Sequence, residues 1–190
     1  MELLLADWVF GYGSLIWNPE IDYQRAELAT AHGYHRSFCI RSTRHRGTRE
    51  DPGVVLGLDR GGSCIGVAFQ LHHAQRRQAI AALYDREMQN RVYVPTLVAI
   101  TLRNGAQLRA LSFVANRASD AYQPLKEAEL LRRLRHCHGG RGSNRDYALN
   151  TFHALRERGV HDARLARLVH QLLGEHRSHH TDSVPTAVSG

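Results

Sequence analysis

Near the N-terminus the sequence reads Val9-Phe10-Gly11-Tyr12-Gly13-Ser14-Leu15-Ile16-Trp17-Asn18-Pro19. The apolar and aromatic residues up to Phe10 predict a strand, and the glycines that follow permit the backbone angles of a tight turn. Consecutive N–H groups in such a turn can bind a carboxylate or a developing oxyanion, and Ser14 adds a hydroxyl donor. An ordinary turn is the alternative. The pattern matches neither GxGxxG nor GxxxxGK[ST], which argues against a nucleotide site.

The chain up to residue 115 predicts a sheet. Runs rich in β-branched and aromatic residues, bounded by Gly, Asp or Asn, favour further strands. These runs cover residues 36–42, 54–58, 65–71, 93–102 and 107–115. Turns are predicted at residues 59–62 and at Asn104-Gly105, which is a favoured hairpin sequence.

Helices are predicted between and after these strands. Residues 73–88 lack Gly and Pro and place apolar side chains on one helical face. Pro124 can open a later helix, and Ser143 with Asp146 can cap the next. Asp162 can cap a third. The fold class is therefore α+β, a small β-barrel or antiparallel sheet with one inserted helix and C-terminal flanking helices.

The composition is that of a single globular domain. The 190 residues are 43% apolar and 23% charged, and we expect one domain at residues 1–175 followed by a disordered tail at 176–190. The net charge of +7 comes from scattered arginines, so we expect no nucleic-acid partner. No apolar run reaches the roughly 20 residues of a membrane span. We expect no membrane partner, and a monomer.

Cysteine and histidine usage bears on compartment and cofactors. Cys39, Cys64 and Cys137 lie far apart and form no CxxC pair, which favours the reducing cytoplasm. The 13 histidines include several close pairs, but none has the spacing of a zinc site such as HExxH. We therefore expect no metal and no cofactor.

Glu87 is the most informative single residue. It lies on the helical face that Ile80 and Leu83 direct toward the core. A carboxylate buried there either pairs with a cation or has its pKa raised toward the range useful for proton transfer at neutral pH. The simpler interpretation is a boundary glutamate bonded to Arg86 or Arg91, and both interpretations remain open.

Four further segments follow in a recognisable order. They are Gly33-Tyr34-His35-Arg36, Arg46-Gly47-Thr48 with Pro52-Gly53, Arg86-Glu87-Met88, and Gly142-Ser143-Asn144-Arg145-Asp146-Tyr147. Together with the stretch at residues 9–19, these segments resemble the ChaC-type γ-glutamylcyclotransferase family over about residues 8–173.

The resemblance implies a fold and an activity. The fold is the γ-glutamylcyclotransferase-like barrel with flanking helices. The activity is that of a lyase that converts glutathione to 5-oxoproline and cysteinylglycine by intramolecular aminolysis, without metal or nucleotide. The family's catalytic glutamate, a general acid and base, carries over onto Glu87.

The resemblance also implies substrate-binding residues. The family's substrate loop carries over onto Tyr12, Gly13, Ser14 and Leu15, with Phe10 and Gly11 leading into it. Tyr147 is a further substrate-binding candidate, with a core aromatic as the equal alternative. Arg41, Arg44 and Arg46 could meet the glycine carboxylate of glutathione, or could simply be solvated charges.

Two other functions remain open. The residues that hold a glutamyl group would equally serve other γ-glutamyl amino acids or amines, because discrimination lies at the other end of the substrate. The second alternative is a non-catalytic regulator of cation transport, the association from which the family takes its name.

Overall fold

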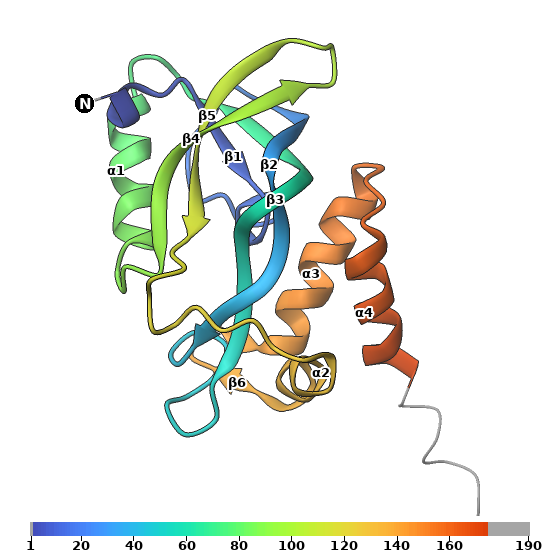
Figure 1. Ribbon diagram of the computed structural model, residues 1–190. Helices are drawn as coiled ribbons and strands as arrows, with labels where there is room; N and C mark the ends of the chain where they lie inside the picture. Colours follow the sequence, from blue (N-terminus) through green and yellow to red (C-terminus); the bar gives the residue numbers. More distant parts are fainter. Residues whose placement is uncertain (1, 175–190) are drawn as a thin grey trace, which may run out of the picture.

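Five strands close into a β-barrel in the computed structural model, which describes residues 2–174 (Figure 1). Their order around the barrel is β1, β3, β2, β4 and β5. The strands are β1 (Trp8–Gly11), β2 (Arg25–Ser42), β3 (Gly53–Gln70), β4 (Tyr93–Leu102) and β5 (Gln107–Ala115). The predicted strands at 93–102 and 107–115 are confirmed at both ends.

The barrel closes because β1 pairs on both of its edges. It runs antiparallel to β3, with Gly11 opposite Val67, and parallel to β5, with Val9 opposite Leu111. Gly66 of β3 allows this close approach, since a Cβ there would lie 2.3 Å from the carbonyl oxygen of Gly11. The barrel interior is filled by buried aromatic and aliphatic side chains, among them Phe10.

Two sequence predictions about β2 and β3 are wrong. Residues 54–58 and 65–70 belong to one strand, which ends at Gln70, and the predicted turn at 59–62 is an irregularity within it. Gly61 and Gly62 have positive φ, 99° and 75°, and lie opposite Gly33 where the register shifts. The glycines therefore form a bulge rather than a reversal. Strand β2 also begins earlier than predicted, at Arg25, because its partner is the continuous β3.

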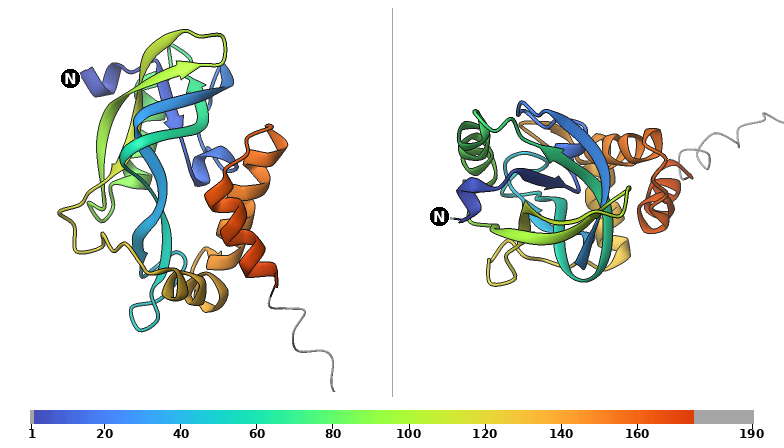
Figure 2. Two further views of the ribbon diagram at one scale, coloured as in Figure 1. Left: turned by 45° about the vertical axis from the view of Figure 1, so that its right-hand side comes forward. Right: turned by 90° about the horizontal axis from the view of Figure 1, so that it is seen from above.

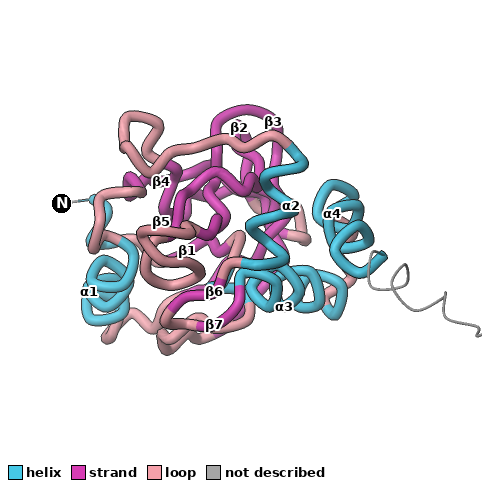
Figure 3. The backbone as a smooth tube through the Cα atoms, turned by 90° about the horizontal axis from the view of Figure 1, so that it is seen from below, coloured by secondary structure: helices cyan, strands magenta, loops and turns pink. Residues whose placement is uncertain are grey.

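Helices cover two sides of the barrel (Figure 2). The helix α1 (Arg76–Glu87) lies on the side of the N-terminus, and α3 (Asn144–Glu157) and α4 (Ala163–Gly174) lie on the other (Figures 1 and 3). Between them in sequence come α2 (Glu127–His136) and the short strands β6 (His138–Gly139) and β7 (Gly142–Ser143). Two 3-10 turns, η1 (Glu2–Leu5) and η2 (Ser14–Ile16), flank β1. No helix within residues 2–174 has the length and apolar character needed to cross a bilayer.

Two of the three predicted helix starts are confirmed, and the one at Pro124 is wrong, because α2 begins at Glu127 with Lys126 as its N-cap. The Ser143 hydroxyl accepts a hydrogen bond from the Asp146 N–H at 2.9 Å, and the Asp162 carboxylate accepts one from the Leu165 N–H at 3.0 Å. Each satisfies one of the N–H groups that a helix start leaves unpaired. The fold class predicted from the sequence is therefore observed. The predicted tail at 176–190 lies outside the described residues.

Asn144 attaches α3 to the barrel. Its side-chain amide donates to the carbonyl of Val54 and accepts from the N–H of Val54, both at 2.7 Å. Asn144 is fully buried, and this two-way bond satisfies both the N–H and the carbonyl of Val54. One helical turn later, Tyr147 is directed toward the same strand.

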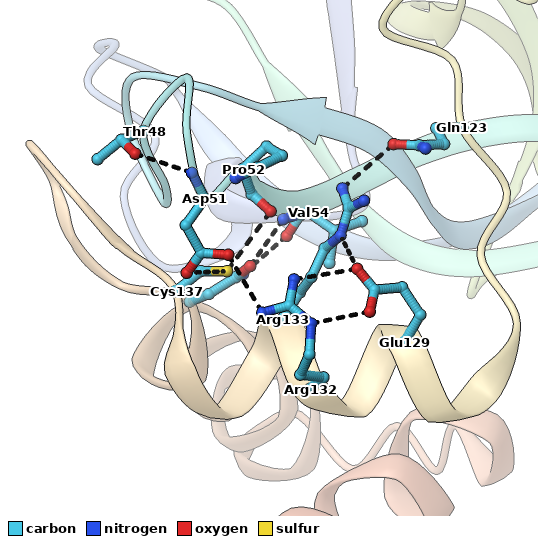
Figure 4. A network of polar contacts seen from close by, with 10 residues as sticks. Thr48, Asp51, Pro52, Val54, Gln123, Glu129, Arg132, Arg133 and Cys137 are labelled. Atoms are coloured by element: carbon cyan, nitrogen blue, oxygen red, sulfur yellow. Dashed lines mark hydrogen bonds and ion pairs between the residues drawn. The ribbon is translucent and has the colours of Figure 1, made fainter.

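A polar network attaches the connection between β2 and β3 to α2 (Figure 4). Arg132 bonds to Glu129 on its own helix and to Asp51 on the connection, at 2.8 and 3.1 Å. The Cys137 thiol contacts both Asp51 and the carbonyl of Pro52 at 3.4 Å. The three cysteines are unpaired and buried. In the same connection, the carbonyls of Arg44 and His45 accept hydrogen bonds from the N–H groups of Gly140 and Arg141 at 2.8 and 3.0 Å.

Candidate active site

A cavity of about 350 Å³ lies beside the C-terminal end of α1 and has Glu87 in its wall. This volume falls within the range of small-molecule sites. Its other walls come from the turn after α1, the start of β4, the end of β2 and the loop before α2. The lining residues include Arg41, Arg44, His45, Arg86, Gln89, Asn90, Tyr93, Ser119 and Asp120.

The Glu87 side chain is only 16% exposed. Burial raises the pKa of its carboxyl group above the usual value, and the guanidinium groups of Arg86 and Arg141 partly offset this rise. Arg86 Nε lies 3.1 Å from Glu87 Oε1. Both interpretations of Glu87 therefore hold at once: it pairs with Arg86, and its pKa is still raised. A raised pKa makes a carboxyl group better suited both to take and to return a proton.

Arg86 connects Glu87 to the loop after β1. Its guanidinium donates to the Ser14 hydroxyl at 2.9 Å and to the Asn18 carbonyl at 2.8 Å, and it pairs with Glu20 at 3.0 Å. The side chain is 11% exposed, so these bonds act with little competition from water. Arg86 thereby fixes the position of the predicted substrate loop relative to Glu87.

The predicted loop residues occupy different environments. Phe10, Tyr12 and Leu15 are buried in the core, and Gly11 is paired within β1. None of residues 10–15 lines the cavity, and the loop reaches Glu87 through the bond from Arg86 to Ser14. No side chain caps the turn at Gly13, and the Ser14 and Leu15 N–H groups donate to no backbone carbonyl in the described chain.

Arg36 holds the same loop from the opposite side. Its guanidinium donates to the Tyr12 carbonyl at 2.6 Å and to the Ile65 carbonyl at 2.7 Å, and it pairs with Asp162 at the start of α4. The side chain of Arg36 is nearly inaccessible to solvent. The loop is therefore held by two buried arginines.

The charge of Glu87 acts on three phenols, of which Tyr12 and Tyr147 are buried and Tyr93 is half-buried. Burial raises the pKa of Tyr12, Tyr93 and Tyr147, that of Tyr147 to about 12, and the negative charge of Glu87 raises all three further. These hydroxyls stay protonated at neutral pH. The Tyr12 hydroxyl donates to the Phe113 carbonyl at 2.7 Å and that of Tyr93 to the Leu56 carbonyl. Tyr147 also approaches the loop, since a Cβ on Gly13 would lie 3.2 Å from its hydroxyl.

Two of these phenols bind the backbone of one residue of β3, Leu56. The Leu56 N–H donates to the Tyr147 hydroxyl at 3.2 Å, and the Tyr93 hydroxyl donates to the Leu56 carbonyl at 2.9 Å. Leu56 lies next to a second register shift, between Phe38 and Ile40 of β2. Tyr93 was missed by the sequence reasoning because, at the start of a strand, a tyrosine is an ordinary β-former.

The arginines proposed for the far end of the substrate separate into two groups. Arg41 and Arg44 line the cavity. Arg46 is buried instead, with its guanidinium 5.3 Å from the centre of the Tyr147 ring and bonded to the Arg141 carbonyl at 2.6 Å. Arg46 packs against the Tyr147 ring. Of the three arginines proposed from the sequence, only Arg41 and Arg44 line the cavity.

The family model of ChaC-like proteins matches residues 7–174. The chain belongs to the ChaC-like family. A relative from Escherichia coli, named glutathione-specific γ-glutamylcyclotransferase, is 34% identical over 172 residues, which are 88% of this chain and 74% of the relative. A human relative, named glutathione-specific γ-glutamylcyclotransferase 1, is 33% identical over 75% of this chain and 66% of its own length.

Solved structures agree on the fold of this ChaC-like protein. The structure of a yeast γ-glutamylcyclotransferase specific to glutathione matches with a TM-score of 0.81 at 23% identity, over 93% of this chain and 99% of that one. A second structure, titled γ-glutamyl cyclotransferase, matches with a TM-score of 0.53 at 12% identity, over 97% and 94%. The γ-glutamylcyclotransferase-like fold expected from the sequence is confirmed.

Replacing Tyr147 by Phe tests the bond that seats α3 on the barrel. The Leu56 N–H would lose its acceptor in a buried site, so we expect Tyr147→Phe to lower the free energy of unfolding by about 1–3 kcal/mol. Urea denaturation measures it. Tyr34→Phe is the control, because the Tyr34 hydroxyl has no hydrogen-bond partner in the described chain. Equal stability of the two variants would contradict this role.

Proposed function

We propose that this ChaC-like protein cleaves glutathione to 5-oxoproline and cysteinylglycine. The observation that carries the proposal is Glu87, a buried carboxyl group with raised pKa in the wall of a cavity. The names of the Escherichia coli and human relatives support glutathione as the substrate. The reaction is a transfer within the substrate, so no water is consumed.

The chemistry requires two protons to pass from the α-nitrogen to the departing cysteine nitrogen. The α-ammonium of the γ-glutamyl group must lose a proton before its nitrogen can attack the γ-carbonyl carbon. Glu87 takes this proton as the general base, the new C–N bond closes the five-membered ring, and a tetrahedral intermediate forms. When the bond to the cysteine nitrogen breaks, Glu87 returns the proton to that nitrogen, and the second proton, released as the ring nitrogen becomes an amide, gives the departing amine its ammonium form. A single carboxyl group with raised pKa can perform both steps.

The protein's other task is to hold the glutamyl chain folded. The nucleophile and the electrophile belong to one molecule, and correct orientation can contribute roughly 7–11 kcal/mol to lowering the barrier. In this proposal the glutamyl end of the substrate extends beyond the residues that line the cavity, and its α-carboxylate or oxyanion binds the Ser14 and Leu15 N–H groups, which donate to no backbone carbonyl within residues 2–174. Arg86 and Arg36 keep this loop in place beside Glu87.

We also propose that the protein acts in the cytoplasm, as a monomer, and without a metal or nucleotide. Its three cysteines are unpaired and buried, as expected in a reducing compartment. The mechanism above uses only side chains, backbone groups and the substrate's own amine. Chelators should therefore leave turnover unchanged.

Release of 5-oxoproline from glutathione tests the proposal, with wild-type and Glu87→Gln protein compared in the presence of a chelator. Gln keeps the shape of the side chain but cannot accept the proton, so we expect a loss of about 10²- to 10⁴-fold in kcat. Glu157→Gln, at an exposed position on α3, is the matched control. Circular dichroism verifies that each variant is folded.

The outcomes separate the functions that the sequence left open. If wild-type protein forms no 5-oxoproline from glutathione but does so from another γ-glutamyl compound, the substrate is wrong and the chemistry stands. If it acts on no γ-glutamyl compound, the proposal fails and a binding role in cation transport becomes the leading alternative. A fully active Glu87→Gln variant would contradict the mechanism alone.

Replacing Arg86 tests what sets the working pH range. Arg86→Gln removes a cation that lowers the pKa of Glu87, so that pKa rises further. The base must be deprotonated in the free enzyme, so the acid limb of the kcat/KM profile should move to higher pH. Arg86→Lys should move it less, because the charge remains, and Arg91→Gln should not move it. A loss of activity that is uniform across pH would mean that Arg86 acts only through folding of the loop.

A further inference from the structure

The end of β2 brings two arginines into the wall of the cavity that contains Glu87. These are Arg41 and Arg44. Their backbones are fixed, because the Arg41 N–H donates to the Ala121 carbonyl and the Arg44 carbonyl accepts from the Gly140 N–H, both at 2.8 Å. The two side chains therefore start from defined positions, although their ends are exposed.

Neither of these guanidinium groups has a hydrogen-bond or ion-pair partner within residues 2–174. The buried arginines near the site differ. Arg36, Arg46 and Arg86 each make several such contacts with the protein. The protein thus uses three arginines to hold its own loops and leaves the remaining two in the cavity wall available to a ligand.

The charge of the cavity wall favours an anion at this end. Glu87 is paired with Arg86, and burial together with the nearby Arg141 and Arg44 guanidinium groups lowers the pKa of His45. A neutral His45 is therefore expected at pH 7. At this end of the cavity, Asp120 contributes one negative charge against the two positive charges of Arg41 and Arg44. The wall therefore keeps an excess of positive charge there.

Substrate length places a second carboxylate away from Glu87. In an extended dipeptide the terminal carboxylate lies about 7 Å from the N-terminal nitrogen, at roughly 3.3–3.6 Å per residue. A cation that binds it must therefore come from an element other than the end of α1. The end of β2 and the connection that follows it supply such cations within the same cavity.

We propose that Arg41 and Arg44 form a carboxylate subsite that binds the C-terminal carboxylate of the departing cysteinylglycine. This inference rests on the proposed function and deepens it. Guanidinium groups suit this task, because their planar donors match a carboxylate. The subsite would select γ-glutamyl peptides with a free C-terminus over γ-glutamyl amines.

Esterification of the glycine carboxylate isolates this contact. Glutathione glycine monoethyl ester keeps the same γ-glutamyl bond and the same α-amine but lacks the terminal charge. We expect wild-type protein to turn over glutathione about tenfold or more better than the ester in kcat/KM. The Arg41→Gln/Arg44→Gln double variant should lose this preference, through a slower reaction with glutathione and an unchanged one with the ester.

Arg49→Gln provides the matched control. Arg49 is an exposed arginine on the same connection between β2 and β3 and does not line the cavity. This variant should keep the wild-type preference for glutathione over the ester. A general effect of net charge on substrate encounter would instead weaken the reaction in both variants alike.

Two results would overturn the subsite. One is a wild-type protein that uses the ester as well as it uses glutathione. The other is a double variant that loses activity toward both substrates by the same factor. The arginines would then contribute nothing specific to binding the terminal carboxylate.

A binding measurement separates this inference from the proposed function. Calorimetric titration with cysteinylglycine and with its ethyl ester measures the affinity of the subsite for each compound without turnover. Binding of the free dipeptide that weakens in the double variant supports the subsite even if no 5-oxoproline is formed. Equal binding of dipeptide and ester to wild-type protein contradicts the subsite whatever the turnover.

Discussion

The carboxyl group of Glu87 is buried at the C-terminal end of α1, where the helix dipole also disfavours a negative charge. An isolated charge in such a place is costly. Arg86 offsets part of this cost and is itself buried, so it needs the further acceptors that Ser14, Asn18 and Glu20 supply. The loop after β1 is thus positioned by the same guanidinium that stabilises the carboxylate. Compensation is incomplete, since the pKa of Glu87 stays raised, and this incomplete compensation is what proton transfer requires.

The barrel supplies the rest of the site where its strand pairing is irregular. Next to the register shift in β2, the backbone of Leu56 binds the hydroxyls of Tyr93 and Tyr147. These residues come from β4 and α3, so the backbone of one residue holds together a strand and a helix that are distant in sequence. Asn144 makes a similar attachment at Val54. Irregular pairing thus gives the helices specific docking points on an otherwise regular sheet.

The sequence predicted the features that depend on near neighbours. The helical period located Glu87 on the buried face of α1, and the caps at Ser143 and Asp162 follow from local hydrogen bonds. The bulge at Gly61-Gly62 was misinterpreted as a turn, because only pairing with β2 distinguishes the two. Tyr93 and His45 enter the cavity from segments far apart in the chain, which no local pattern connects to Glu87. Arg46 could be separated from Arg41 and Arg44 only by its tertiary contacts.

The central claim is that Glu87 is a buried acid/base group with a raised pKa. Carboxyl ¹³C NMR titration of the wild-type protein measures this pKa directly, with the resonance assigned by its absence in the Glu87→Gln variant. An exposed glutamate titrates near pH 4.3 (about the value in model peptides). The account predicts a midpoint clearly above that value. A midpoint at or below it would show that pairing with Arg86 outweighs burial, and would contradict Glu87 as the group that carries the proton.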